Sequence, residues 1–227
     1  MNDFLTSAPA FRDRREAGQA LAKVLRAQVG PGEPPVILAL PRGGVPVAYE
    51  IALQLHAPLD LLLVRKIGAP GHEEFAIGAV ADGAHPHWII DQDMLKQFNV
   101  PAQWFDAQKD RQLREIERRR ALYCGDNPPI SIAGRDVIVV DDGVATGNTA
   151  KVALMTLADA HPKRLRFATP VGAREALDAL RPQVDEVICL ATPEPFRAVG
   201  FHYEQFDQTS DEEVIDLLGK ARQRFAG

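Results

Sequence analysis

The sequence lacks the features of a metal-rich, secreted or membrane protein. It has two cysteines in 227 residues, and Cys124 and Cys189 lie too far apart for the spacing of a metal site, so we expect reduced thiols. No run approaches the roughly 18 apolar residues that a membrane span needs. Residues 1–15 contain no apolar core of the kind found in signal peptides. These absences lead us to expect a cytoplasmic protein that does not bind a membrane.

Excess positive charge and two common nucleotide-binding motifs are also missing. The chain carries 26 Lys and Arg against 31 Asp and Glu, a formal net charge of −5, which argues against a general surface for nucleic-acid backbones. Neither G-x-x-x-x-G-K-[ST] nor G-x-G-x-x-G occurs. The arginine triplet at residues 118–120 stands among acids, which favours a solvated helix face or a subunit contact over a nucleic-acid patch.

The composition is that of an ordinary globular domain. Apolar residues make up 46% and charged residues 25% of the chain, and 227 residues suffice to bury a sizeable core. Alternation of apolar runs with helix-periodic segments predicts an α/β fold, with a Rossmann-like, mostly parallel central sheet flanked by helices. We expect one domain over residues 1–227, with its core at about 36–191 and a C-terminal segment at about 192–227.

Strand and helix ranges follow from the same periodicity. The expected strands cover residues 36–40, 60–64, 75–80, 88–90, 137–140, 164–169 and 184–191. The expected helices cover residues 11–28, 47–55, 101–123, 151–157, 173–180 and 210–224, with a brief helix beginning at residue 91. Asp13 is the expected N-cap of the first helix, and Ser210 with Glu213 forms a capping-box pattern before the last.

A contiguous motif in the second half combines a strand, an acid pair and a loop of small residues. Residues 137–140 are β-favouring and apolar, which is typical of a strand buried on both faces of a parallel sheet. Asp141 and Asp142 mark its carboxyl end, where open α/β sheets place ligands, and their oxygens suit sugar hydroxyls or a divalent cation. Residues 143–149 then lead into a helix, whose first amides favour a phosphate. The motif therefore predicts a pocket for a ribose 5-phosphate.

This stretch, VIVVDDGVATGNT, resembles the 5-phosphoribosyl-1-pyrophosphate (PRPP) binding motif of the type I phosphoribosyltransferases. The resemblance implies that Asp141 and Asp142 bind the ribose 2- and 3-hydroxyls, and that the loop after them wraps the 5-phosphate with its amides and threonine hydroxyls. The loop residues so assigned are Gly143, Val144, Ala145, Thr146, Gly147, Asn148 and Thr149. Gly143 departs from the family pattern, which usually has an apolar residue there. The alternative is a buried strand that ends in an Asp-Asp-Gly turn and a Thr-rich helix cap.

A second strand, loop and helix occur near the start of the chain. The apolar residues 36–40 precede Pro41-Arg42-Gly43-Gly44, and a glycine pair between a strand and a helix lets the backbone approach a phosphate. The resemblance identifies this segment with the family's pyrophosphate loop, in which Arg42 meets the leaving pyrophosphate and Gly43 and Gly44 admit the backbone. In the family, this loop often contains a non-proline cis peptide. The alternative is an αL turn with a solvent-facing arginine.

Residues 67–74 lose periodicity and gain Gly68, Pro70 and Gly71. In the family, this region is a mobile loop that closes over PRPP, and a basic residue at its root meets the pyrophosphate. Lys66 is the first candidate for that role and Arg65 the second. An exposed hairpin without such a role is the alternative. The family also covers its sheet with a small hood, which residues 192–206 would form here; their aromatic side chains either stack on a heterocycle or pack the lobe.

The resemblance implies a Mg²⁺-dependent enzyme that transfers ribose 5-phosphate from PRPP to a nitrogenous base and releases pyrophosphate. Arg42 and Lys66 would stabilise the leaving group, while Asp141 and Asp142 orient the ribose and support a Mg²⁺ ion bound largely by PRPP. The acceptor base is not identified, and the family habit suggests a homodimer. A regulatory protein that senses PRPP or nucleotides on the same fold is the second hypothesis, and a phosphosugar hydrolase is the third.

Overall fold

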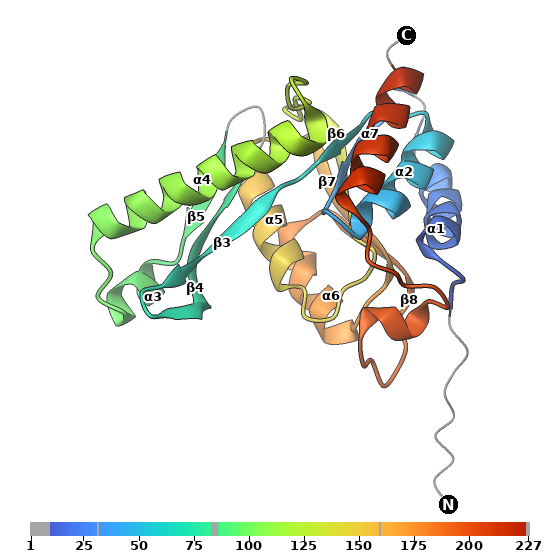
Figure 1. Ribbon diagram of the computed structural model, residues 1–227. Helices are drawn as coiled ribbons and strands as arrows, with labels where there is room; N and C mark the ends of the chain where they lie inside the picture. Colours follow the sequence, from blue (N-terminus) through green and yellow to red (C-terminus); the bar gives the residue numbers. More distant parts are fainter. Residues whose placement is uncertain (1–9, 31, 83–85, 159, 226–227) are drawn as a thin grey trace, which may run out of the picture.

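The computed structural model describes residues 10–30, 32–82, 86–158 and 160–225. Its centre is a five-stranded, all-parallel sheet in the order β2-β1-β6-β7-β8 (Figure 1). The strands of this sheet are β1 (Val36–Ala39), β2 (Leu59–Leu61), β6 (Asp136–Val140), β7 (Arg164–Val171) and β8 (Glu186–Ala191). The expected α/β class with a parallel central sheet is confirmed.

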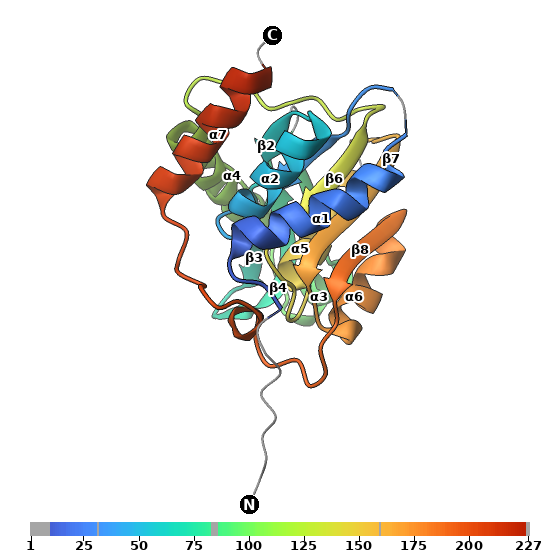
Figure 2. The ribbon, with the colours of Figure 1, turned by 90° about the vertical axis from the view of Figure 1, so that its right-hand side faces the viewer.

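Helices cover both faces of this sheet. The α-helices are α1 (Arg14–Gln28), α2 (Gly44–Leu55), α3 (Gln92–Gln97), α4 (Ala102–Cys124), α5 (Asn148–Ala158), α6 (Arg174–Leu180) and α7 (Asp211–Phe225). Figure 2 shows α1 and α2 in front of one face, with α7 beside α2, while α5 and α6 lie behind the sheet. None of the helices in the described ranges is long and apolar enough to cross a membrane.

Alternate side chains of the central strands supply two separate cores. Ile37 and Ile138 are fully buried on the side of α1 and α2, whereas Leu38 and Val139 pack on the side of α5 and α6. A strand covered on both faces must be apolar at every position, which is why the runs in the sequence are continuous rather than alternating. Asp13 caps α1 as expected, because its side chain accepts a hydrogen bond from the Glu16 amide at 2.8 Å.

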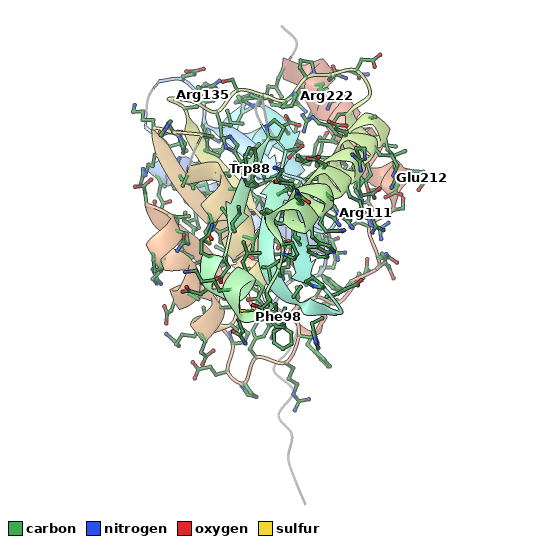
Figure 3. All side chains as sticks on the ribbon, turned by 90° about the vertical axis from the view of Figure 1, so that its left-hand side faces the viewer. Trp88, Phe98, Arg111, Arg135, Glu212 and Arg222 are labelled. Atoms are coloured by element: carbon green, nitrogen blue, oxygen red, sulfur yellow. The ribbon has the colours of Figure 1, made fainter. Side chains whose placement is uncertain are left out.

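A second, smaller sheet projects from the first and packs under the long helix α4 (Figures 1 and 3). It is antiparallel and contains β3 (Val64–Ala69), β4 (His72–Ala81) and β5 (His87–Ile90). The strand expected at residues 60–64 is therefore wrong as a single element: β2 ends at Leu61 in the large sheet, and β3 begins at Val64 in the small one. Apolar content alone carried no sign of this change of sheet.

Residues 67–74, expected as an irregular loop with an exposed hairpin as the alternative, form the tip of a β-hairpin. Strands β3 and β4 pair across it, with register shifts on both sides of Gly68. A Cβ at Gly68 would lie 2.5 Å from the Glu73 carbonyl oxygen, so glycine permits this close approach. Gly71 has a φ of 72° and closes the turn. The glycines that interrupted the pattern thus mark a bulge and a turn rather than the loss of a strand.

The C-terminal part of the chain crosses the carboxyl end of the large sheet before it enters α7. Residues 192–206 contain one short 3₁₀ helix at Val199–His202. The Ser210 hydroxyl accepts a hydrogen bond from the Glu213 amide at 3.1 Å, which is one half of the expected capping box. Val214, Leu217, Leu218 and Ala221 form the buried stripe of α7.

Candidate functional site

The strand order of the large sheet reverses between β1 and β6. The connection from β1 returns to β2 on one side, whereas the chain after β6 moves to β7 and β8 on the other. Such a switch point leaves a crevice at the carboxyl ends of the two strands, where ligands of open α/β proteins bind. A cavity of about 490 Å³ lies there, lined by Arg42 and Gly43 after β1, by Asp141 and Asp142 after β6, and by Thr149.

Close packing against the acids explains the two glycines after β1. A Cβ at Gly43 would collide with Asp142 Oδ2, and one at Gly44 would lie 2.6 Å from the Val140 carbonyl oxygen. Gly43 itself has φ −58° and ψ −36°, so the alternative of an αL turn is wrong. The peptide bond between Pro41 and Arg42 is cis, as expected for the pyrophosphate loop.

Arg42 does not point freely into solvent. Its Nη1 lies 3.4 Å from Asp211 Oδ1, at the first residue of α7. The same carboxyl oxygen accepts a hydrogen bond from the Tyr123 hydroxyl at 2.7 Å, and this bond is the main reason that the pKa of Asp211 is lowered. Three elements thus meet at Asp211, which holds the arginine at the edge of the cavity.

The two acids differ in their surroundings. Asp142 Oδ2 accepts a hydrogen bond from Arg14 Nε at 2.7 Å, and both side chains are nearly buried. Asp141 Oδ1 accepts a bond from the Asp142 amide at 2.9 Å. Burial and the neighbouring Asp142 carboxylate raise the pKa of Asp141 well above its usual range. A hydroxyl donor or a cation beside Asp141 would therefore stabilise its ionised form.

The loop after the acids divides into an inner and an outer part. The Val144 amide donates to the Val171 carbonyl at 3.0 Å, so it is not free for a phosphate. Gly147 has a φ of 72° and lies buried against α6. Ala145, Thr146, Asn148 and Thr149 are exposed, and α5 starts at Asn148. The first amides of a helix have no partner within the helix, so this end of α5 has donors available for a ligand.

Gly143 has a local explanation that concerns packing. A Cβ there would collide with Val199 Cγ1 of the 3₁₀ helix. Val199 therefore fills the space that a larger residue at position 143 would occupy. The departure from the family pattern at this position is accommodated by the segment that crosses above it.

Lys66 and Arg65 lie on opposite faces of β3, since side chains alternate along a strand. Arg65 lines a narrow crevice next to Pro41 and Thr149, close to the cavity described above. Lys66 is exposed and lines a second cleft, between the hairpin and α4, to which Arg65 also contributes. The structure thus brings Arg42, Gly43, Asp141, Asp142 and Thr149 together, but it does not bring Lys66 to them.

Arg14 lines the cavity and was not found from the sequence, whereas its neighbours Tyr203 and Phe206 belong to the segment expected to form the hood. The Arg14 guanidinium lies 3.9 Å from the centre of the Phe206 ring, and its Nη1 donates to the Asp207 carbonyl at 2.6 Å. The Tyr203 hydroxyl donates to the Asp142 carbonyl at 2.5 Å. Arg14 is 128 residues from Asp142 in the chain, so no local pattern could have indicated the contact.

Two aromatic residues of the C-terminal segment, Tyr203 and Phe206, pack against each other. The rings of Tyr203 and Phe206 stack with centroids 5.1 Å apart, and Phe11 lies 5.8 Å from Tyr203. Phe206 also lines the cavity and is 36% exposed. One ring of this cluster, therefore, remains accessible from the site.

No group of three or more His, Cys, Asp or Glu side chains that could hold a metal ion occurs among the residues described. The donor chemistry at the cavity consists of two adjacent carboxylates, of which Asp142 is paired with Arg14. Asp141 would be the oxygen ligand of a Mg²⁺ ion there. Because the pKa of Asp141 is raised, the positive charge of the ion would stabilise its carboxylate form. These residues fit an ion whose remaining ligands come from a phosphorylated substrate.

A family model for the phosphoribosyl transferase domain matches residues 12–205. The chain therefore belongs to the phosphoribosyl transferase family. A protein of Mycobacterium tuberculosis (strain H37Rv), named provisionally as a phosphoribosyl transferase, is 42% identical over 217 residues, which cover 95% of this chain and 48% of the relative. The chain thus spans about half the length of the curated relatives it matches.

Solved structures share the same fold. The protein TT1426 from Thermus thermophilus aligns with a TM-score of 0.80 at 40% identity, over 92% of this chain and 98% of that chain. A hypothetical protein from Neisseria gonorrhoeae, solved with bound ppGpp, aligns with a TM-score of 0.50 at 16% identity, over 92% of this chain and 93% of that one. At 16% identity, the second likeness shows the fold alone.

Proposed function

We propose that this protein is a Mg²⁺-dependent phosphoribosyltransferase that transfers ribose 5-phosphate from PRPP to a nitrogenous base. One observation carries the proposal: the acid pair after β6, the glycine loop after β1 and the start of α5 line or adjoin a single cavity at the switch point of the sheet. Family membership supports the use of PRPP. A cytoplasmic location and a homodimer remain part of the proposal, and the acceptor base is not identified.

In this proposal, each part of the cavity binds one part of PRPP. Asp141 and Asp142 accept hydrogen bonds from the ribose hydroxyls, and the exposed amides and hydroxyls at Thr146 and Thr149 donate to the 5-phosphate. Mg²⁺, when bound, neutralises charge on the pyrophosphate. Because Gly43 and Gly44 have no side chains, the loop after β1 can lie in contact with the end of β6 and with Asp142. In this arrangement, the loop backbone and Arg42 face the leaving group.

Cleavage of the bond between C1 and the pyrophosphate oxygen develops positive charge on the ribose and negative charge on the leaving group. Cationic side chains held in place before the reaction stabilise that negative charge without reorganisation. Arg42 is the first such group, fixed by Asp211. We propose Arg65, rather than Lys66, as the second, because Arg65 lines the crevice beside Pro41 and Thr149. No nucleophilic side chain is required.

The test is incubation of the purified protein with PRPP, Mg²⁺ and a pool of free bases, with pyrophosphate and nucleotide as products. Arg42→Ala should lower turnover by about 100-fold or more, as expected when a charge-stabilising donor is removed. Arg174→Ala is the matched control, because Arg174 is exposed and pairs with Glu194 outside the cavity. Full turnover by Arg42→Ala would refute the assignment of the pyrophosphate loop.

The second candidate is a protein that binds PRPP or a nucleotide without turnover. The ion pair between Asp142 and Arg14 favours it, since a ribose diol must compete with the arginine for that carboxylate. Calorimetric binding of PRPP with no product from any base would support this candidate. Release of inorganic phosphate from ribose 5-phosphate would instead indicate a phosphosugar hydrolase.

A further inference from the structure

A cleft of about 330 Å³ lies between the β3–β4 hairpin and helix α4, apart from the PRPP cavity. The strand side contributes Arg65 and Lys66, and α4 contributes Trp104, Gln108, Arg111 and Gln112. Figure 3 looks onto α4 and the small sheet, with Arg111 labelled on the helix. The volume falls within the usual range of pockets for small ligands.

The charge of this cleft is opposite to that of the whole protein. Among the side chains that the structure describes, three cations and one acid, Glu73, line it, whereas the chain as a whole has a net charge of −5. Within the described part of the chain, no ion pair is formed by Arg65, Lys66 or Arg111. The next arginines along the same helix do have acidic partners: Arg118 and Arg119 pair with Glu115, and Arg120 pairs with Asp60 and Asp82.

Converging unpaired cations in a concave site create a positive potential that attracts an anion. Arg65 is already fixed, because its Nε donates to Gln112 Oε1 at 2.6 Å. A guanidinium has five N–H donors, so its remaining groups can donate to a phosphate in the bidentate manner. Lys66 and Arg111 approach from opposite walls, the strand and the helix.

The helix side of the cleft offers a different chemistry. Residues 104, 108, 111 and 112 recur at the three- and four-residue spacing that places side chains on one helix face. Trp104 is half-buried, so part of its ring is accessible for stacking on a planar group. The Gln108 amide can both donate and accept hydrogen bonds at the edge of a heterocycle.

We propose that this cleft is a second ligand site, which binds a small molecule with a phosphate and a planar ring, of the nucleotide class. The phosphate lies against Lys66, Arg111 and Arg65, and the ring lies on Trp104. The inference goes beyond the proposed transferase activity and does not depend on it: Arg65 is shared by the two proposals, whereas Lys66, Arg111 and Trp104 belong to the cleft alone. Arg65 lines both this cleft and the crevice beside Pro41 and Thr149.

Fluorescence can test this, because the chain has two tryptophans and Trp88→Phe leaves Trp104 as the reporter. The Trp88→Phe protein is titrated with AMP, GMP and inorganic phosphate. The expected result is saturable quenching by a nucleotide that weakens with added salt. Arg111→Ala in the same background should lower the nucleotide affinity by about tenfold, the usual loss for a charge-assisted hydrogen bond. Arg118→Ala, which removes an exposed arginine paired with Glu115, should leave it unchanged.

Two further comparisons separate the cleft from the PRPP cavity. Quenching that persists in Arg42→Ala supports the cleft, whereas quenching lost in Arg42→Ala but kept in Arg111→Ala overturns it. Equal affinities in Arg111→Ala and Arg118→Ala, or no saturable quenching by either nucleotide, also overturn it. Arg111-dependent binding in a protein without PRPP turnover would leave the cleft standing and refute the transferase proposal, so the two are tested separately.

Discussion

Arg14 is the residue that most constrains the acid pair. It holds Asp142 through an ion pair of 2.7 Å, it is stacked on Phe206, and it donates to the Asp207 carbonyl. Its positive charge also opposes the rise in the pKa of Asp141 that burial and Asp142 cause. Arg14 therefore positions Asp142 and limits the rise in the pKa of Asp141. It also attaches the C-terminal segment to the edge of the cavity.

Replacement of Arg14 by alanine should shift the pH dependence of PRPP binding. Asp141 must be ionised to accept hydrogen bonds from the diol, so affinity falls as the pH drops through its raised pKa. Without the Arg14 charge that pKa rises further, and the acidic limb of binding should move to higher pH. Calorimetric titration of Mg²⁺–PRPP across the range from about pH 5 to about pH 8 measures this shift. Arg14→Lys keeps the positive charge, so the acidic limb of PRPP affinity should stay at its original pH. Arg15→Ala, which removes an exposed partner of Glu50, is the control and should not shift the limb.

Gly44 should tolerate no side chain, because a Cβ would lie 2.6 Å from the Val140 carbonyl oxygen and 3.1 Å from Asp141 Cα. Both atoms belong to the backbone of the β6 end and cannot move aside cheaply. Gly44→Ala should therefore lower the free energy of unfolding by about 1–3 kcal/mol. Gly219→Ala in α7 meets nothing within 4 Å and should raise it by about 0.5–1 kcal/mol. Urea unfolding of the two variants, monitored by circular dichroism, would show opposite signs.

At the scale of elements, the central strands were predictable and the small sheet was not. Strands β1 and β6 are buried on both faces, so their sequences carry an unbroken apolar run that local reasoning detects. The change from β2 to β3 occurs within one apolar stretch, and the choice of sheet depends on partners far along the chain. The acid pair and the glycine loop were found because each lies at a strand end. Arg14 and Asp211 reach the site only through tertiary contacts.

Helix α7 is amphipathic, and its buried face contributes stability through packing on α2 and α4. Leu218 is fully buried in the core shared with these helices, whereas Ile215 is 40% exposed. Leu218→Ala should lower the free energy of unfolding by about 2–5 kcal/mol, through lost burial and the cavity left behind. Ile215→Ala should change it by about 0.5 kcal/mol or less. Alanine is introduced in both variants, so the difference between them reports the burial of the replaced side chain. Equal losses of unfolding free energy in urea titrations would contradict the assignment of Leu218 to the buried face and Ile215 to the exposed face.

At the scale of the whole molecule, the small sheet is joined to the large one by a continuous core. Ile67, Ile77 and Phe105 of the small sheet and α4 belong to the same cluster as Ile51 and Ile138 of the main body. Arg120 of α4 adds ion pairs of 2.7 Å to Asp60, within β2, and 2.6 Å to Asp82, just beyond β4. The lobe that carries the proposed nucleotide cleft is thus packed and tethered on the body that carries the cavity proposed for PRPP.

This continuity predicts that both parts unfold together. The two tryptophans, Trp88 of β5 and Trp104 of α4, report on the small lobe, whereas far-ultraviolet circular dichroism reports mainly on the helices of the whole chain. In urea, the two signals should give coincident transitions with one midpoint, since a shared core leaves neither part a stable state of its own. Trp88→Phe should leave the fluorescence midpoint in place, because the remaining Trp104 lies in the same unit. A fluorescence transition at lower urea would instead show that the lobe opens first, and the cleft and the PRPP cavity would then be free to move apart.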